Sequence, residues 1–105
     1  MSEWSNLYEY TPTNVRLYVS ETLGLYRLIY YSEDKYCVFY IGHSNNLKEG
    51  LLEHLRTSDP DSCIRNHIKG HTCYFRYLQV SAQAELKMIE RQQIVQYNPD
   101  CNPRW

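Results

Sequence analysis

Two segments rich in aromatic and β-branched residues stand in the first half of the chain, and they predict a pair of β-strands. Residues 23–31 read LGLYRLIYY and residues 36–42 read YCVFYIG, with the polar stretch SEDK between them. Strand-like runs on either side of a polar turn indicate a β-hairpin. Neither run alternates cleanly between apolar and polar positions, so we expect both faces of the sheet to be covered by helices.

The rest of the pattern predicts helices and one further strand. Thr11-Pro12 starts a short helix to Val19, because proline fits the first helical turn. The elements predicted after the hairpin are a leucine-striped helix to about Thr57 capped by Ser44 or Asn45, a short helix near 62–69 ended by Gly70, a strand over 72–80, and a helix from Ser81 to about Tyr97. Asp59-Pro60-Asp61 breaks the chain between the first two helices, and Pro99 stops the last one.

These elements define an α/β (α+β) fold, a three-stranded antiparallel sheet flanked by helices in the order β-β-α-α-β-α. The 105 residues are enough for a single domain with a modest core. Within it, we interpret residues 1–22 as an N-terminal preamble and residues 23–105 as the folded domain.

The net charge argues against a protein that coats nucleic acid in general. Such proteins are usually strongly basic, whereas the formal net charge here is −1. Any contact with nucleic acid is therefore expected to be local or assisted by a partner. Most of the 11 tyrosines are interpreted as strand formers.

The cysteines and histidines show no metal-binding pattern. The four cysteines are Cys37, Cys63, Cys73 and Cys101. They form no C-x-x-C pair and no zinc-binding spacing, so we expect reduced thiols. With no apolar leader and no membrane-spanning run, a cytoplasmic location without a membrane partner is expected. His67 and His71 suit ligation on one helix face, but Gly70 is expected to end that helix between them and no third ligand is evident nearby, so we expect two solvated surface histidines.

Glu90 is a carboxylate within the apolar stripe of the last predicted helix. It lies four residues after Leu86 and four before Ile94, so the three share a face. A carboxylate that faces a core is costly unless it is paired, hydrogen-bonded or bound to a metal. From this position alone, an edge location in which Glu90 reaches solvent is favoured, with a functional role as the alternative.

Short motifs on the hairpin and on the helices occur together in an order that resembles the GIY-YIG nuclease family. GLY at 24–26 matches the first motif and YIG at 40–42 the second. HSNNLKEGLLEHL (43–55) is similar to the helix that follows, and AELKMIERQQIVQYNPDCN (84–102) to the closing helix. The resemblance covers about residues 23–102.

The resemblance implies a metal-dependent endonuclease that hydrolyses nucleic-acid phosphodiester bonds, with DNA favoured over RNA. Tyr26 and Tyr40 are expected to flank the scissile phosphate and to position or deprotonate the attacking water, joined by His54 as a proton-transfer or orienting group. Glu90 is expected to bind a single Mg²⁺ or Mn²⁺ that polarises the phosphate. Asn102 is expected to support the site by hydrogen bonding.

One position departs from the family pattern, in which an arginine stands four residues before the histidine. This chain has Gly50 there, and loss of such a donor slows an enzyme about a hundredfold to a thousandfold. Glycine in a helix costs about 1 kcal/mol relative to alanine, so either something approaches closely at Gly50 or the position has drifted. We expect a gap there on the cleft wall. Lys48 and Arg56 point away from that face. The candidates to supply the missing cation are Arg65, Lys69 and Arg76.

Three functions are compatible with these residues. The first is an active endonuclease, and the second is a degenerate relative that binds nucleic acid or a protein partner without cutting. The third is a protein-interaction domain that keeps only the fold. Gly50 and the near-neutral charge favour the second function, whereas the first is favoured by the retained Tyr26, Tyr40, His54, Glu90 and Asn102.

The register of the hairpin decides whether the motif tyrosines can act together, because side chains alternate between the faces of a strand. Pairing of Tyr31 with Tyr36 by itself places Tyr26 and Tyr40 on opposite faces. Pairing of Tyr31 with Lys35 places them on the same face. We expect the second register, or another of the same parity reached through a β-bulge.

Overall fold

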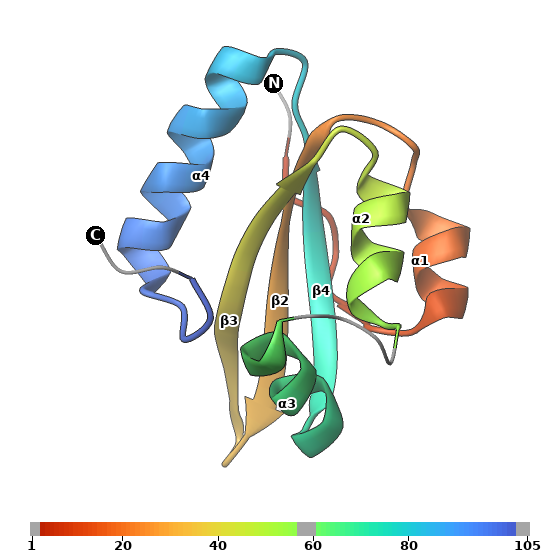
Figure 1. Ribbon diagram of the computed structural model, residues 1–105, viewed down its shortest axis with the longest axis vertical. Coiled ribbons are helices and arrows are strands. Elements are labelled where there is room, and N and C mark those ends of the chain that lie inside the picture. The colour runs from red at the N-terminus through yellow and green to blue at the C-terminus, as the bar shows by residue number, and fades with distance from the viewer. Residues whose placement is uncertain (1–2, 57–60, 103–105) are drawn as a thin grey trace.

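This computed structural model describes residues 3–56 and 61–102. They form one antiparallel sheet with helices on both faces (Figure 1). The elements are β1 (Tyr8–Glu9), α1 (Pro12–Tyr18), β2 (Gly24–Ser32), β3 (Lys35–Ser44), α2 (Leu47–His54), α3 (Ser62–Gly70), β4 (Thr72–Gln79) and α4 (Gln83–Tyr97). Helices α1, α2 and α3 lie on one side of the sheet and α4 on the other (Figure 1). None of the described helices is both long and apolar enough to cross a bilayer.

The sheet has one strand more than predicted. Among the described residues it is 4-stranded in the spatial order β1-β4-β2-β3, because Tyr8 pairs with Phe75 and Glu9 with Tyr74. The prediction of three strands was therefore wrong. A strand of 2 residues is too short to show a periodic pattern, so only its pairing partner reveals it. In this order β3 is an edge strand, and β1 lies at the opposite edge.

The other predicted elements are confirmed, with corrections at two helix ends. Helix α1 begins after Thr11, whose side chain accepts a hydrogen bond from the Asn14 amide. Helix α2 is capped by Asn46 rather than by the two preceding residues. Helix α4 has Ala82 at its cap position with no side-chain hydrogen bond, so the predicted Ser81 cap was wrong. The predicted end at Thr57 and the Asp59-Pro60 break lie outside the described residues.

The core is divided between the two faces of the sheet. The larger cluster joins α1, α2 and α3 to the sheet, with Leu28, Leu51 and Phe75 fully buried. The smaller cluster joins α4 to the other face through residues such as Leu25 and Leu86. The segment before β2 contributes Tyr10, Val15 and Val19 to the larger cluster. The N-terminal preamble therefore packs into the same core as the sheet.

A β-bulge sets the parity of the hairpin. The turn is the two-residue pair Glu33-Asp34, with φ of 51° and 61°, and Tyr31 pairs with Tyr36. The predicted Tyr31–Lys35 pairing was therefore wrong. The register then shifts, so that Leu28 faces Tyr40 while its neighbour Ile29 faces Val38. Phe39 is the extra residue, and this bulge restores the parity that the motif tyrosines require.

The prediction of reduced thiols was also wrong. Cys63 on α3 forms a disulfide with Cys101, which follows α4, across a sequence separation of 38. Closing a loop of this length removes conformational entropy from the unfolded chain, equivalent to about 4 kcal/mol of stability in the chain-entropy picture. Cys37 and Cys73 carry free thiols, and burial raises the pKa of the Cys73 thiol to about 11. The disulfide removes the thiol argument for a cytoplasmic location.

Candidate functional site

Tyr26, Tyr40 and His54 form a contiguous cluster on the face of the sheet covered by α2. The Tyr26 hydroxyl lies 2.8 Å from His54 Nε2, within hydrogen-bonding distance. The centroids of the Tyr26 and Tyr40 rings are 6.1 Å apart, and those of Tyr40 and His54 are 5.5 Å apart. Three predicted site residues, separated in sequence, therefore come together as expected.

Gly42 forms the floor beneath these rings. A Cβ added at Gly42 would lie 2.5 Å from the Tyr26 hydroxyl oxygen and 2.7 Å from Cε2 of Tyr40. Both contacts are far shorter than normal van der Waals separation, so a side chain there would displace the rings. The close approach of the two rings to the strand requires glycine at this position. Packing therefore explains the glycine of the second motif.

Glu90 is paired with a histidine that sequence reasoning did not select. Its Oε2 lies 2.7 Å from Nδ1 of His43, and the Glu90 side chain is 20% exposed. Glu90 is therefore only partly exposed rather than fully solvated, and its carboxylate has a partner. His43 directly follows YIG in the sequence, and that adjacency was the only available signal.

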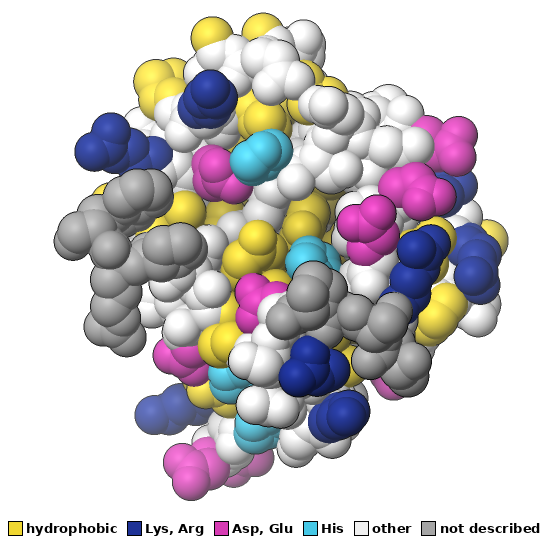
Figure 2. All heavy atoms as spheres, viewed as in Figure 1, with side chains coloured by type: hydrophobic (Ala, Val, Ile, Leu, Met, Phe, Trp, Pro, Cys, Tyr) yellow, Lys and Arg dark blue, Asp and Glu magenta, His cyan; other side chains and the backbone are white. Residues whose placement is uncertain are grey.

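Strand β3 carries both Tyr40 of the tyrosine cluster and His43 of the His43–Glu90 pair. Tyr40 and Gly42 face α2, whereas His43 faces the α4 side, because side chains alternate along a strand. Strand β3 is at the edge of the sheet, so groups on its two faces can approach around that edge. Figure 2 shows this face hollowed between α4 and α2, with hydrophobic side chains on the floor and a touching acidic and histidine pair at the α4 side.

Asn102 fastens the closing segment to β3 beside this site. Its Oδ1 accepts a hydrogen bond from the Ile41 amide at 2.8 Å, and its Nδ2 donates to the Ile41 carbonyl at 2.9 Å. The Cys101 amide donates to the Phe39 carbonyl. The side chain of Asn102 thus occupies the edge of β3 as another strand would. Asn102 therefore contacts the backbone of Ile41, which lies between Tyr40 and Gly42 of the second motif. This position is consistent with a supporting role.

Gly50 does not leave the expected gap. A Cβ at Gly50 would lie 2.8 Å from Cβ of Ser44 and 3.0 Å from its Oγ, so α2 and the end of β3 are packed too closely for a side chain. The expectation of an open cleft wall was wrong. Arg76 does not fill the role either, because its Nη1 donates to the Ser5 carbonyl and it pairs with Arg27 on the face opposite Tyr26.

Substitution of Gly50 by alanine is expected to destabilise the protein by about 1–3 kcal/mol, despite alanine's higher helix propensity, because the close contact with Ser44 resembles overpacking. The matched control is Gly70→Ala on α3, where an added Cβ meets nothing within 4 Å and stability is expected to change little or increase. Urea unfolding of both variants provides the measurement. Equal effects of the two substitutions would contradict the close-packing explanation.

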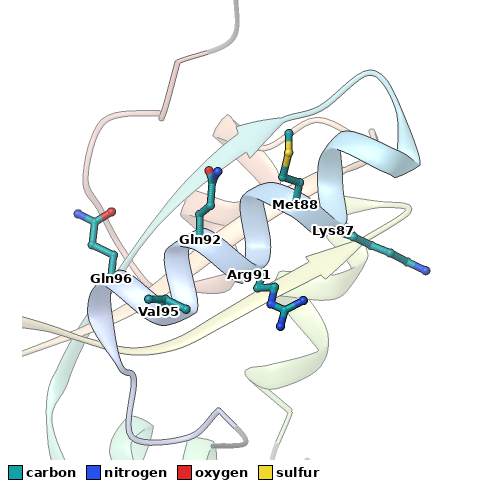
Figure 3. Close-up of a pocket in the computed structure, with 6 residues that line it drawn as sticks. All are labelled: Lys87, Met88, Arg91, Gln92, Val95 and Gln96. Atoms are coloured by element: carbon teal, nitrogen blue, oxygen red, sulfur yellow. The ribbon is translucent and has the colours of Figure 1, made fainter. Parts of the chain in front are cut away.

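Two cationic residues, Lys87 and Arg91, lie near Glu90 on α4. A pocket of about 220 Å³ is lined by Lys87, Glu90, Arg91 and Ile94. Lys87 and Arg91 also line a hollow on the outward side of α4, where Figure 3 shows them extending away from Met88 and Gln92. All the residues that line the pocket and the hollow come from α4, so both are open surface of one helix. Lys87 and Arg91 therefore place positive charge on the same helix surface as Glu90.

Comparison with known proteins supports the fold. No protein-family model matches the chain, and no curated protein matches it. The GIY-YIG N-terminal endonuclease domain of UvrC from Thermotoga maritima, bound to magnesium, is 20% identical, with a TM-score of 0.66 over 88% of this chain and 96% of that chain. A point mutant of the same domain, bound to its catalytic divalent cation, is 19% identical, with a TM-score of 0.67 over 89% and 96% of the two chains.

The chain therefore has the fold of the GIY-YIG endonuclease domains. The likeness extends across nearly the whole of the solved domain, and the predicted motifs lie on the expected elements. GLY is on β2, YIG is on β3, and the closing helix is α4. This defines a nuclease-type fold.

Proposed function

We propose that this protein is a metal-dependent endonuclease that hydrolyses phosphodiester bonds in nucleic acid. The observation that carries the proposal is the hydrogen-bonded Tyr26–His54 pair, which lies against Tyr40 over the Gly42 floor. A hydroxyl paired with an imidazole can relay a proton. Together with the partly buried carboxylate of Glu90 on α4, which is paired with His43 of β3, this arrangement supplies the groups needed to activate water beside a bound metal.

Glu90 is the residue that we expect to hold a divalent cation, Mg²⁺ or Mn²⁺. Magnesium in phosphoryl-transfer sites is commonly bound by one or two carboxylates, with waters and substrate phosphate oxygens as the other ligands. A single carboxylate, partly open to solvent and engaged by His43 through one oxygen, fits that donor set. When bound, such an ion polarises the phosphate and stabilises the leaving oxygen.

The tyrosines and His54 are expected to prepare the attacking water. In the tautomer whose Nε2 carries no proton, His54 accepts the hydrogen bond from the Tyr26 hydroxyl. The Tyr26 oxygen then presents lone pairs to a water, and the proton that the water loses passes toward the imidazole. Tyr40, whose ring lies against both, limits the space in which that water and the phosphate are held.

The missing arginine is expected to be compensated in part by cations beside Glu90. Lys87 and Arg91 line the open surface of α4 that includes Glu90. These groups can stabilise negative charge on a phosphate. Their placement differs from that of a residue on α2, so we expect slow cleavage rather than none.

The substrate that we propose is DNA, with recognition by local contacts. The net charge of −1 provides little long-range attraction for a polyanion. A structured feature of the nucleic acid, or a partner protein, is therefore expected to bring the substrate to the site. The alternative function is binding of nucleic acid or a protein partner without cleavage, and the close packing at Gly50 is the observation that favours it.

Tyr26→Phe is expected to slow metal-dependent cleavage by about a hundredfold to ten-thousandfold, the usual contribution of a positioned proton-transfer group. The substitution removes the hydroxyl bonded to His54 and keeps the buried ring. The measurement is the single-turnover rate on linear and branched DNA with Mg²⁺ or Mn²⁺.

The matched control is Tyr31→Phe, which makes the same change on an exposed ring of the same strand, where the hydroxyl bonds Asp34. That variant is expected to cleave at the original rate. If the unmodified protein binds DNA but does not cut it with either metal, the binding function is the better one. If Tyr26→Phe cuts normally, the Tyr26–His54 pair has no role in the chemistry.

A further inference from the structure

A second group of metal-ligating side chains lies away from the Glu90 site, where α3 meets the segment after α4. Cys63, His67 and Cys101 each offer a ligand atom, and these atoms all lie within 4.8 Å of one another. Cys63 and His67 are one helical turn apart, so they share a face of α3. Asp100 is a fourth candidate, because its Oδ2 is 3.4 Å from Nε2 of His67.

The surrounding structure holds this group in place from both sides. The His67 ring stacks on Phe39, with centroids 4.7 Å apart, and on Tyr30 at 4.8 Å. On the other side, the Cys101 amide donates to the Phe39 carbonyl at 2.8 Å. Both halves of the group are thereby tied to the same bulged residue of β3. The ligand atoms are positioned by packing and backbone hydrogen bonds in addition to the disulfide.

The donor set is one that zinc prefers. Zinc binds cysteine thiolates at about 2.3 Å and imidazole nitrogen at about 2.0–2.1 Å in tetrahedral sites, and carboxylate oxygen serves as a further ligand. Ligand atoms in such a site are about 3.5–3.8 Å apart, so the observed group needs only a small adjustment once the two sulfurs are no longer bonded to each other. The sequence separation of 38 between the cysteines conceals this set from spacing rules.

We propose that Cys63, His67 and Cys101, with Asp100 as the fourth ligand, bind a zinc ion when the Cys63–Cys101 disulfide is reduced. A dithiol supplies the two electrons and two protons that convert the disulfide into two thiols, and is itself oxidised to a disulfide. Zinc then displaces the two thiol protons and binds both thiolates. The disulfide and the zinc ion are thus alternative cross-links between the same two segments.

The zinc site has a structural role that is separate from the proposed nuclease chemistry. In a reducing compartment it replaces the lost disulfide and keeps α3 joined to the closing segment. That segment continues directly into Asn102, which is bonded to Ile41 on β3. The metal-loaded reduced protein is therefore expected to keep the closing segment in place, whereas the metal-free reduced protein lacks this cross-link.

The test is cobalt and zinc titration of the full chain after reduction with a phosphine, with thiol counting to verify that all four cysteines are free. We expect one Co²⁺ to bind per chain, with the visible absorption bands of a tetrahedral site and thiolate charge-transfer absorption. Zinc is expected to displace it and to raise the melting temperature of the reduced protein. The oxidised protein is expected to give neither the absorption bands nor the zinc-dependent increase.

Two variants separate the ligands from their surroundings. His67→Gln retains the disulfide and can be folded in the oxidised form before reduction, and we expect it to bind zinc more than about a hundredfold more weakly, since even loss of a ligand's hydrogen-bond partner costs about 10- to 100-fold. Cys37→Ser is the matched control and should bind zinc normally. Absence of the cobalt spectrum in the reduced protein, unchanged affinity in His67→Gln, or loss of binding in Cys37→Ser would each overturn the proposal.

Discussion

Glu90→Gln is expected to reduce metal-dependent cleavage by more than about a thousandfold. The metal's stabilisation of transition-state charge amounts to several kcal/mol, and each 1.4 kcal/mol corresponds to about a factor of ten in rate. The glutamine keeps an oxygen that can accept a hydrogen bond from Nδ1 of His43, so the packing between α4 and β3 is expected to persist. The measurement is the single-turnover cleavage rate over a range of Mg²⁺ and Mn²⁺ concentrations.

The matched control is Glu85→Gln, which removes the same charge from an exposed position in the first turn of α4. Its cleavage rate and metal dependence should equal those of the original protein. If Glu90→Gln retains cleavage within a few-fold, the carboxylate is not a metal ligand and the His43–Glu90 pair is structural. If both variants lose cleavage equally, the effect is one of general charge and not of the site.

Asn102→Asp is expected to destabilise the protein by more than about 3 kcal/mol at pH 8. The asparagine is 9% exposed, and its Nδ2 donates to the Ile41 carbonyl. A carboxylate oxygen in that place cannot donate, so two acceptors face each other and a charge is left poorly solvated. An unsatisfied buried polar group costs about 1–3 kcal/mol, and a charged one costs more.

The same variant is expected to recover part of its stability at acidic pH. The protonated carboxyl can donate to the Ile41 carbonyl, so folding raises the pKa of the introduced group. A raised folded-state pKa means that the lost stability returns as the pH falls through that value. Urea unfolding at pH 8 and pH 5 measures this, with Asn66→Asp on the exposed side of α3 as the control. A variant equally stable at both pH values, or one as stable as the control, would contradict the role assigned to Asn102.

The hairpin shows which features of the fold the sequence pattern could predict and which it could not. Strong local signals, such as the aromatic and β-branched runs on β2 and β3, predicted both strands because strand preference and turn residues act over short distances. The requirement that Tyr26 and Tyr40 share a face also predicted the parity of the register. The two-residue turn and the bulge at Phe39 that together produce that parity were not determined locally, since the partner strands select among several turns of similar energy.

The elements that were missed depend on partners distant in the sequence. Strand β1 has 2 residues and exists only because β4 offers an open edge. The Cys63–Cys101 bond joins residues 38 apart, and the His43–Glu90 pair joins residues 47 apart. Spacing rules search short windows, so they cannot find such pairs.

The amino-acid sequence by itself predicted the helices and the three longer strands in their order, without β1, and the residues proposed for the site: Tyr26, Tyr40, His54, Glu90 and Asn102. Tertiary structure alone decided which of these side chains meet. It placed the Tyr26 hydroxyl on His54 and packed Gly50 so closely against Ser44 that no side chain fits there. The physical reason is that secondary structure follows from local backbone and side-chain preferences, whereas contacts across the fold depend on how the helices pack on a twisted, bulged sheet.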